Sequence, residues 1–183
     1  CIALRFIRLS KTLEYIGWGA FYRCESLEAL FLPSTVTSIE CKAFYYCRSL
    51  RLLILPHGID LNKVGRAIIH DTGIHQIAVN AGVEYVFERH ADNTGESNRR
   101  VNEWLFRHMD GAPFHKLCHN SSIITKHIND YLNEHGNDSA RAIDTIHGMT
   151  PLHMLSMNPH SPADAIAALL DVDMEVAFRL DGN

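Results

Sequence analysis

The sequence predicts an α+β chain in which a solenoid of short parallel strands precedes an all-α helical repeat region. A segment recurs in the first half at a constant offset of 23, and two helix-like segments of the second half are related by an offset of 38. A change of net charge between the halves is the third observation. The expected boundaries are 1–83 for the solenoid, 84–103 for a linker and the start of a helix, and 104–183 for the helical repeats.

The composition is that of a folded protein, with 46% hydrophobic and 21% charged residues. Residues 1–83 carry nine Lys and Arg against six acids, a net charge of +3, whereas residues 84–183 carry eight against fifteen, a net charge of −7. Neither half reaches the charge density of a nucleic-acid-binding protein. No apolar run approaches the roughly 20 residues of a membrane span. We therefore expect two modules with different surfaces, no nucleic acid partner and no membrane span.

The repeat in the first half places the same residue types at the same point of each unit. At an offset of 23 the matched pairs are Ala20-Phe21 with Ala43-Phe44, Cys24 with Cys47, and Leu30-x-Leu32-Pro33 with Leu53-x-Leu55-Pro56. The Leu-x-Leu step has a period of two, which predicts a short strand with both leucines facing the core. Proline ends that strand because it cannot donate to a continuing ladder. One unit cannot bury its own apolar side, so stacked units share one core.

These residues resemble the BspA-like leucine-rich-repeat family, whose unit of about 23 residues reads roughly Leu-x-x-Ile-x-x-x-Ala-Phe-x-x-Cys-x-x-Leu-x-x-Leu-x-Leu-Pro. The resemblance covers about residues 1–83, and a degenerate unit with one extra residue continues it at Ala67-Ile68, Ile74, Ile77 and Val79. It implies a curved solenoid with a parallel sheet on its concave side, used for adhesion or recognition. It does not identify a ligand.

The segment between the two repeats is polar. Glu88 to Arg100 is expected to form a linker or exposed loop. The following residues, 101–109, are expected to form a short helix because Val101, Trp104 and Leu105 share one face at helical spacing.

Two segments of the second half are similar to each other at an offset of 38, Ala112-Pro113-Phe114-His115 and Thr150-Pro151-Leu152-His153. Thr150 is expected to cap a helix with Pro151 in its first turn, where the missing N–H costs nothing. Thr-Pro-Leu-His at the start of a helix resembles the ankyrin repeat, which implies a turn followed by two antiparallel helices. The longer spacing and Ala112 in place of threonine indicate a divergent, ankyrin-like pair.

The solenoid also predicts a binding surface. If Leu30 and Leu32 face the core, Ala29 and Phe31 face outward on the concave sheet. The equivalent outward positions in the other units are Phe6, Arg8, Leu52, Ile54, Gln76 and Ala78. An exposed apolar stripe rimmed by arginine is typical of a protein-binding face, and its expected residues are Arg5, Phe6, Arg8, Phe31, Arg51, Leu52 and Ile54. Packing of this face against the helical repeats, or against a part of the protein outside this chain, is an equal alternative.

The five cysteines favour buried thiols over disulfides. Cys1, Cys24 and Cys47 fall at one repeat position, which predicts a column of thiols in the core. The total is odd and no Cys-x-x-Cys pair occurs, which argues against a closed disulfide framework.

These observations favour a protein–protein interaction scaffold, with no catalytic residue, cofactor or metal site. One alternative is a regulatory or targeting region of a larger enzyme or signalling protein. Another is a metal-assisted or thiol enzyme that uses His115, Cys118 and His119, which share one helix turn. No orienting group or phosphate-binding loop accompanies this cluster, and His115 occupies the position of the ankyrin histidine, which implies a hydrogen bond between neighbouring turns.

Compartment and chain ends are only weakly constrained. Unpaired thiols and ankyrin-like repeats favour an intracellular protein, whereas BspA-like repeats are often found at cell surfaces. The chain begins with Cys1 and both ends interrupt a repeat, so we expect it to be a fragment of a longer chain with protein partners.

Overall fold

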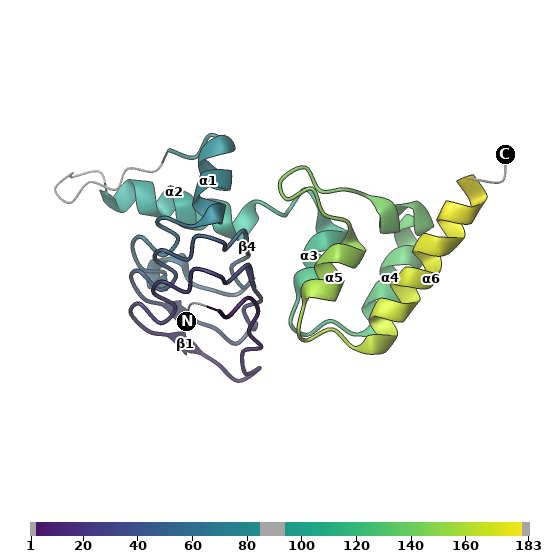
Figure 1. The fold of residues 1–183 in the computed structure, drawn as a ribbon, viewed down its shortest axis with the longest axis horizontal. Coiled ribbons are helices and arrows are strands. Elements are labelled where there is room, and N and C mark those ends of the chain that lie inside the picture. Colours follow the sequence, from purple (N-terminus) through teal and green to yellow (C-terminus); the bar gives the residue numbers. More distant parts are fainter. Residues whose placement is uncertain (1–2, 85–93, 181–183) are drawn as a thin grey trace. The chain divides into compact units, whose positions relative to one another are not determined.

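The computed structural model of the chain describes residues 3–84 and 94–180. The chain forms two compact units, Cys1–His108 and Met109–Asn183 (Figure 1). The first is a solenoid of short parallel strands, and the second is helical. Among the helices described, none combines the length and the apolar character needed to cross a lipid bilayer.

Short strands build two narrow parallel sheets in the first unit. These strands are β1 (Tyr15–Ile16), which pairs with β3 (Ser38–Ile39), and β2 (Ala29–Leu30), which pairs with β4 (Leu52–Leu53). Ile16 lies opposite Ile39 and Leu30 lies opposite Leu53. Both pairs have the offset of 23 found in the sequence, so one sequence unit forms one coil. We call residues 13–33, 36–56 and 59–83 the second, third and fourth coils.

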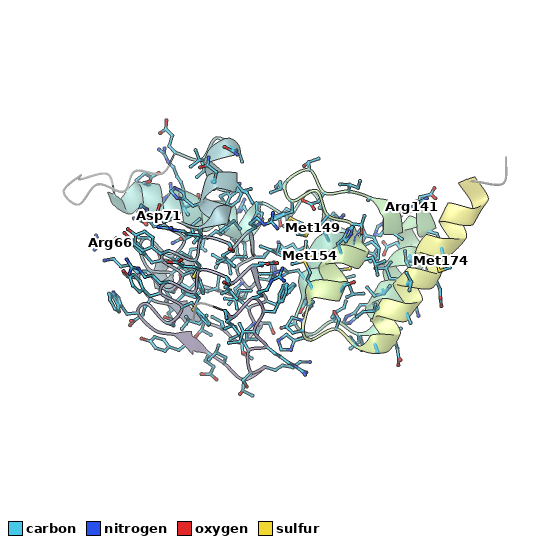
Figure 2. The ribbon with its side chains drawn as sticks, viewed as in Figure 1. Arg66, Asp71, Arg141, Met149, Met154 and Met174 are labelled. Atoms are coloured by element: carbon cyan, nitrogen blue, oxygen red, sulfur yellow. The ribbon has the colours of Figure 1, made fainter. Side chains whose placement is uncertain are left out.

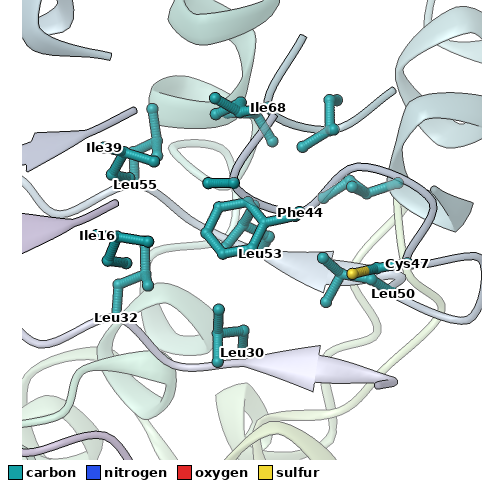
Figure 3. Close-up of a cluster of buried hydrophobic side chains, with 14 of the residues drawn as sticks. Ile16, Leu30, Leu32, Ile39, Phe44, Cys47, Leu50, Leu53, Leu55 and Ile68 are labelled. Atoms are coloured by element: carbon teal, nitrogen blue, oxygen red, sulfur yellow. The ribbon is translucent and has the colours of Figure 1, made fainter. Parts of the chain in front are cut away.

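The apolar side chains of successive coils meet between the two sheets (Figure 3). Leu30, Leu53 and Phe44 have no solvent-exposed surface, and the ring of Phe21 stacks on that of Phe44 with centroids 5.6 Å apart. The Cys47 thiol, also fully buried, donates a hydrogen bond to the Phe21 carbonyl oxygen at 2.9 Å. The expected inward orientation of the Leu-x-Leu leucines is confirmed.

The column of buried thiols is confirmed for Cys24 and Cys47, each at most 3% exposed. Cys1 lies outside the described residues.

The fourth coil departs from the repeat. Ile39 forms a parallel bridge with Val64, an offset of 25 in place of 23, so this coil has two extra residues and the expected single one is wrong. Where a strand over Ile77 to Val79 is expected, the chain instead forms helix α1 (Gly73–Asn80), so Gln76 and Ala78 lie on a helix and not on the sheet. The Thr72 hydroxyl caps it by accepting the His75 N–H at 3.1 Å.

Helix α2 (Thr94–Arg107) packs on the solenoid core of the first unit. Its side chains Val101 and Leu105 are buried in the core cluster. The Asn102 amide donates to the Val64 carbonyl oxygen at 3.2 Å, and the backbone N–H of Leu55 donates to the Leu105 carbonyl oxygen at 3.3 Å. Helices α1 and α2 lie at one end of the stacked coils (Figure 1).

The unit boundary therefore differs from the one expected at 83 and 104. The structure continues the first unit to His108 because the apolar face of α2 completes its core. Of the polar segment expected as a linker, residues 94–100 are helical and residues 88–93 lie outside the described part. Polarity alone is misleading here, since an amphipathic helix is polar over most of its surface.

The second unit contains two helix pairs related by the offset of 38 found in the sequence. The first pair is α3 (Pro113–His119) and α4 (Thr125–His135), and the second is α5 (Pro151–Met157) and α6 (Ala163–Leu180). Helix α3 packs on α5, and α4 packs on α6. Two short 3-10 helices complete the described structure, η1 (Leu61–Lys63) in the first unit and η2 (Asn137–Arg141) in the second.

Buried polar side chains join the two helix pairs. His115 Nε2 lies 3.1 Å from the Ala142 carbonyl oxygen and 2.8 Å from that of Met149. The Asn158 amide donates to the Cys118 carbonyl oxygen at 3.0 Å. At the start of α5, the expected Thr150 cap is confirmed, since its hydroxyl accepts the His153 N–H at 3.3 Å.

The carboxylate of Asp144 organises the turn before α5. It accepts the backbone N–H of Ile146 at 3.0 Å, of His147 at 2.6 Å and of Met149 at 2.9 Å. Burial raises the pKa of Asp144, but hydrogen bonds from the side chain and backbone of His147 and from the backbone of Met149 outweigh it and hold the pKa below its ordinary value. The turn thus depends on a charged carboxylate.

We expect Leu105→Ala to lower the free energy of unfolding of the first unit by about 3 kcal/mol, because it leaves a cavity under α2. Urea denaturation followed by circular dichroism measures this. Leu170→Ala removes the same atoms from a side chain that is 43% exposed, and should cost less than about 1 kcal/mol. A cost below about 1 kcal/mol for Leu105→Ala would show that α2 is not part of the core of the first unit.

We expect Asp144→Asn to destabilise the second unit by about 2 kcal/mol at neutral pH, because charged hydrogen bonds are lost. A carboxylate with a depressed folded pKa stabilises above its unfolded pKa, so its contribution should decline as the pH falls below about 4. Urea denaturation at pH 7 and pH 3 measures both effects. The exposed Asp138→Asn is the control, and a constant difference between Asp144→Asn and the parent at both pH values would contradict the assignment.

Candidate functional site

A row of aromatic rings crosses the turns of three successive coils. The Tyr22 and Tyr45 rings stack with centroids 5.9 Å apart, and Tyr46 meets Tyr45 edge-on at 4.6 Å. The imidazole of His70, in the fourth coil, lies 4.8 Å from Tyr45. We call these four residues, together with the cations Arg23, Lys42 and Arg48, the tyrosine face.

The repeat unit itself positions these rings. In the second and third coils the tyrosines lie between the Phe and the Cys of the repeat pattern, as in Phe44-Tyr45-Tyr46-Cys47. Phe44 and Cys47 point into the core and are fully buried, whereas Tyr45 and Tyr46 are partly exposed. Stacking the coils therefore stacks the outward residues as well.

Cations surround the rings. The Arg23 guanidinium lies 5.6 Å from the Tyr22 centroid and 5.5 Å from that of Tyr46, and the Lys42 ammonium lies 5.5 Å from the Tyr45 centroid. These distances are those of cation–π pairs. The turn segments 19–24, 42–48 and 66–71 carry four Lys or Arg and a single carboxylate, so the face has a positive charge. Figure 2 shows Arg66 and Asp71, at the fourth turn, close together at one edge of the solenoid.

The backbone under the face is in the left-handed region. Five residues other than glycine have φ between 54° and 61°: Arg23, Lys42, Tyr46, Ala67 and Asp71. This conformation costs roughly 1–2 kcal/mol for an L-residue. Hydrogen bonds to the next coil hold it, such as the Tyr46 N–H to the His70 carbonyl oxygen at 3.0 Å. Retained backbone strain of this kind concentrates at functional sites.

Burial favours the uncharged forms of Tyr45 and His70 at the centre of the face. Burial, with the neighbouring Tyr46, raises the pKa of Tyr45, so its phenol keeps its proton. Burial also lowers the pKa of His70 and of the adjacent His75, and this effect outweighs the opposing charge of Asp71 at both. At neutral pH both imidazoles are uncharged, and the face presents flat rings with fixed positive charges at its rim.

The residues expected to form a binding stripe on the concave sheet divide into two groups. Arg5, Phe6, Arg8 and Arg51 are exposed. The structure describes Phe31, Leu52 and Ile54 as buried, each at most 5% exposed, and so differs from the expected open stripe. Strand alternation separates the two faces of a sheet, but it does not determine whether the outward face meets water.

The cluster of His115, Cys118 and His119 lies in the interior of the second unit, each at most 5% exposed. His115 is committed to two backbone carbonyls. Burial raises the pKa of Cys118 to about 12, so the thiol keeps its proton at neutral pH and lacks the thiolate that nucleophilic catalysis requires. Within the described part of the chain, no three metal-ligating side chains gather at one point.

The tyrosine face is not among the sites expected from the sequence. Its signal is the chemistry of the unspecified positions in the repeat, Tyr22-Arg23 in one coil and Tyr45-Tyr46 in the next. The regular leucine pattern lies in the strand residues, so the sequence predicts the binding site on the sheet. The turn, where the outward side chains are aromatic, is overlooked.

Cysteine reactivity should follow burial. Burial raises the pKa of both Cys47 and Cys118 to about 12, whereas Cys41 is only partly buried at the solenoid surface. We expect timed alkylation at pH 8, resolved by peptide mass spectrometry, to label Cys41 well before Cys47 and Cys118, because the thiolate is the reacting form. In urea all three thiols should react at similar rates. Labelling of Cys118 in the native protein as fast as that of Cys41 would contradict the prediction and support the thiol-enzyme alternative.

Comparison with known proteins assigns the solenoid. Residues 1–94 match the BspA type leucine rich repeat region in six copies, and repeat regions of this type are generally binding modules. Searches of the curated proteins and of the solved structures found no match. The helical second unit has no family assignment, and the ankyrin likeness stays a proposal. With its repeat offset of 23, parallel strands and matched repeats over half its length, the chain belongs to the BspA-type leucine-rich-repeat family.

Proposed function

We propose that the chain is a protein-recognition scaffold whose tyrosine face binds an acidic, extended segment of a partner protein. The observation that carries the proposal is the continuous contact of Tyr22, Tyr45, Tyr46 and His70 across three coils, with cations over the rings. Tyrosine and arginine dominate the energetic centres of protein interfaces. The tyrosine ring supplies a large contact area with little loss of conformational freedom.

The shape of the face favours an extended segment. Neighbouring coils are separated by about 4.8 Å, the spacing of parallel strands, so the rings of three coils form a strip about 10 Å long. An extended chain advances about 3.3 Å per residue, which places three or four residues of a partner on the strip. Arg23, Lys42 and Arg48 favour carboxylate side chains in that segment.

The helical unit supports the same class of function. We infer that it is a divergent pair of ankyrin-like repeats, supported by the Thr150 cap, the His115 bonds to neighbouring carbonyls and the Asp144 turn. Repeat arrays of this kind bury one side of each unit and leave a broad outer surface. No catalytic role is part of the proposal.

A peptide-display selection on the whole chain tests the proposed site. We expect enriched peptides to carry Asp and Glu beside an aromatic residue, and fluorescence anisotropy to give affinities that weaken with added salt. Arg23→Glu should reduce the affinity about tenfold or more, because it places a like charge against the bound carboxylates.

Arg8→Glu is the matched control, since Arg8 is exposed on the same solenoid but belongs to the stripe expected on the concave sheet. Its binding should stay within about twofold of the parent, since distant surface charges are screened. Loss of binding in Arg8→Glu with full binding in Arg23→Glu would place the interface on the stripe expected on the concave sheet and contradict the proposal.

A further inference from the structure

A surface pocket of about 360 Å³ lies on the first unit, away from the rings of the tyrosine face. Its walls come from the second, third and fourth coils, with Trp18, Glu40, Cys41 and Lys63 among its lining residues. This volume is at the lower end of those that hold small molecules.

Two backbones approach each other closely at Gly65, one of the lining residues of the pocket. The Gly65 N–H donates to the Ile39 carbonyl oxygen at 2.7 Å. A Cβ on Gly65 would collide with the backbone of Glu40 and Cys41, which cannot move aside as a flexible side chain can. Glycine is therefore required at this close approach of the third and fourth coils.

The indole of Trp18 forms one wall and is 64% exposed. Trp18 sits between Gly17 and Gly19, and its backbone N–H donates to a carboxylate oxygen of Glu40 at 2.8 Å. Glu40 also accepts a hydrogen bond from the Tyr15 phenol, which raises the pKa of Tyr15. One carboxylate thus anchors the segment that presents the indole and also lines the pocket.

The polar groups of the lining are balanced. Glu40 accepts hydrogen bonds, Lys63 donates them, and Ser38 and Asn62 can do both. The single negative and single positive charge leave the site without a net preference for an anion or a cation. Of the other lining residues, Trp18, Ile39 and Val64 are apolar, and Cys41 and Gly65 complete the lining.

We propose that this pocket binds one ring of a neutral saccharide, with its C–H face on the Trp18 indole and its hydroxyl groups on Glu40 and Lys63. A pyranose ring has one apolar face and a rim of hydroxyls that each donate and accept, which matches a single exposed aromatic plane beside mixed donors and acceptors. A proline-rich peptide fits less well because proline has no N–H to donate to Glu40. Glu40 repels an anionic ligand, and Lys63 repels a cationic one.

NMR of the ¹⁵N-labelled whole chain tests the site directly, because the two tryptophans, Trp18 and Trp104, give two indole N–H signals. The probes are glucose, galactose, mannose and N-acetylglucosamine with their di- and trisaccharides. We expect at least one probe to shift the Trp18 signal saturably and to leave the Trp104 signal in place. In the same titrations, followed through the backbone N–H signals of the lining residues Lys63 and Gly65, Trp18→Ala should weaken binding about tenfold or more. Glu40→Gln should weaken it about threefold, since a neutral acceptor binds hydroxyls less strongly.

Two controls separate this site from the tyrosine face and from misfolding. Tyr22→Ala removes an aromatic ring that is 43% exposed on the same solenoid and should leave saccharide affinity unchanged. An unshifted Trp104 signal in Trp18→Ala reports an intact fold. The proposal is overturned if no probe shifts Trp18 saturably, if Trp18→Ala binds as tightly as the parent, or if a polyproline peptide shifts Trp18 while every saccharide fails.

Discussion

The stacking of one coil on the next is the constraint on which the first unit depends. A single coil exposes one apolar side, and a neighbouring coil stacked in register covers it. The pairing of Leu30 with Leu53 and the stacking of Phe21 on Phe44 meet this requirement at a constant offset of 23. Backbone hydrogen bonds between turns, such as the Phe21 N–H to the Ala43 carbonyl oxygen at 2.8 Å, keep the coils aligned.

The same register gives the outer surface its chemistry. Residues that follow the inward Phe are carried outward at each step, so Tyr22 and Tyr45 stack as a consequence of the core beneath them. The left-handed turn residues recur for the same reason. The fourth coil has gained two residues by Val64, and the pocket lies beside this bridge, whereas the row of rings continues into the same coil at His70.

The ends of a stacked array need different solutions, because the last coil has no neighbour. In the first unit, α1 takes the place of the strand expected in the fourth coil. Helix α2 adds Val101 and Leu105 to the core. The second unit joins its helix pairs by buried polar groups, with His115 and Asn158 reaching backbone carbonyls across the repeat. Such bonds specify register between helices more sharply than apolar contact does, because a buried polar group left unpaired is costly.

The sequence by itself determined the coil length, the inward residues and the capped start at Thr150, since these follow from spacing and local chemistry that recur in each unit. It did not determine the secondary structure of Ile74 to Val79, whose spacing suits a helix as well as a strand. It also did not determine that α2 packs on the solenoid core, because the polar residues of α2 resemble a linker. It also left open which outward residues meet water: Phe31 and Leu52 are buried, whereas the tyrosines of the turns are partly exposed. Exposure and the end of a repeat depend on what lies next to a surface in space, and only the tertiary structure contains that information.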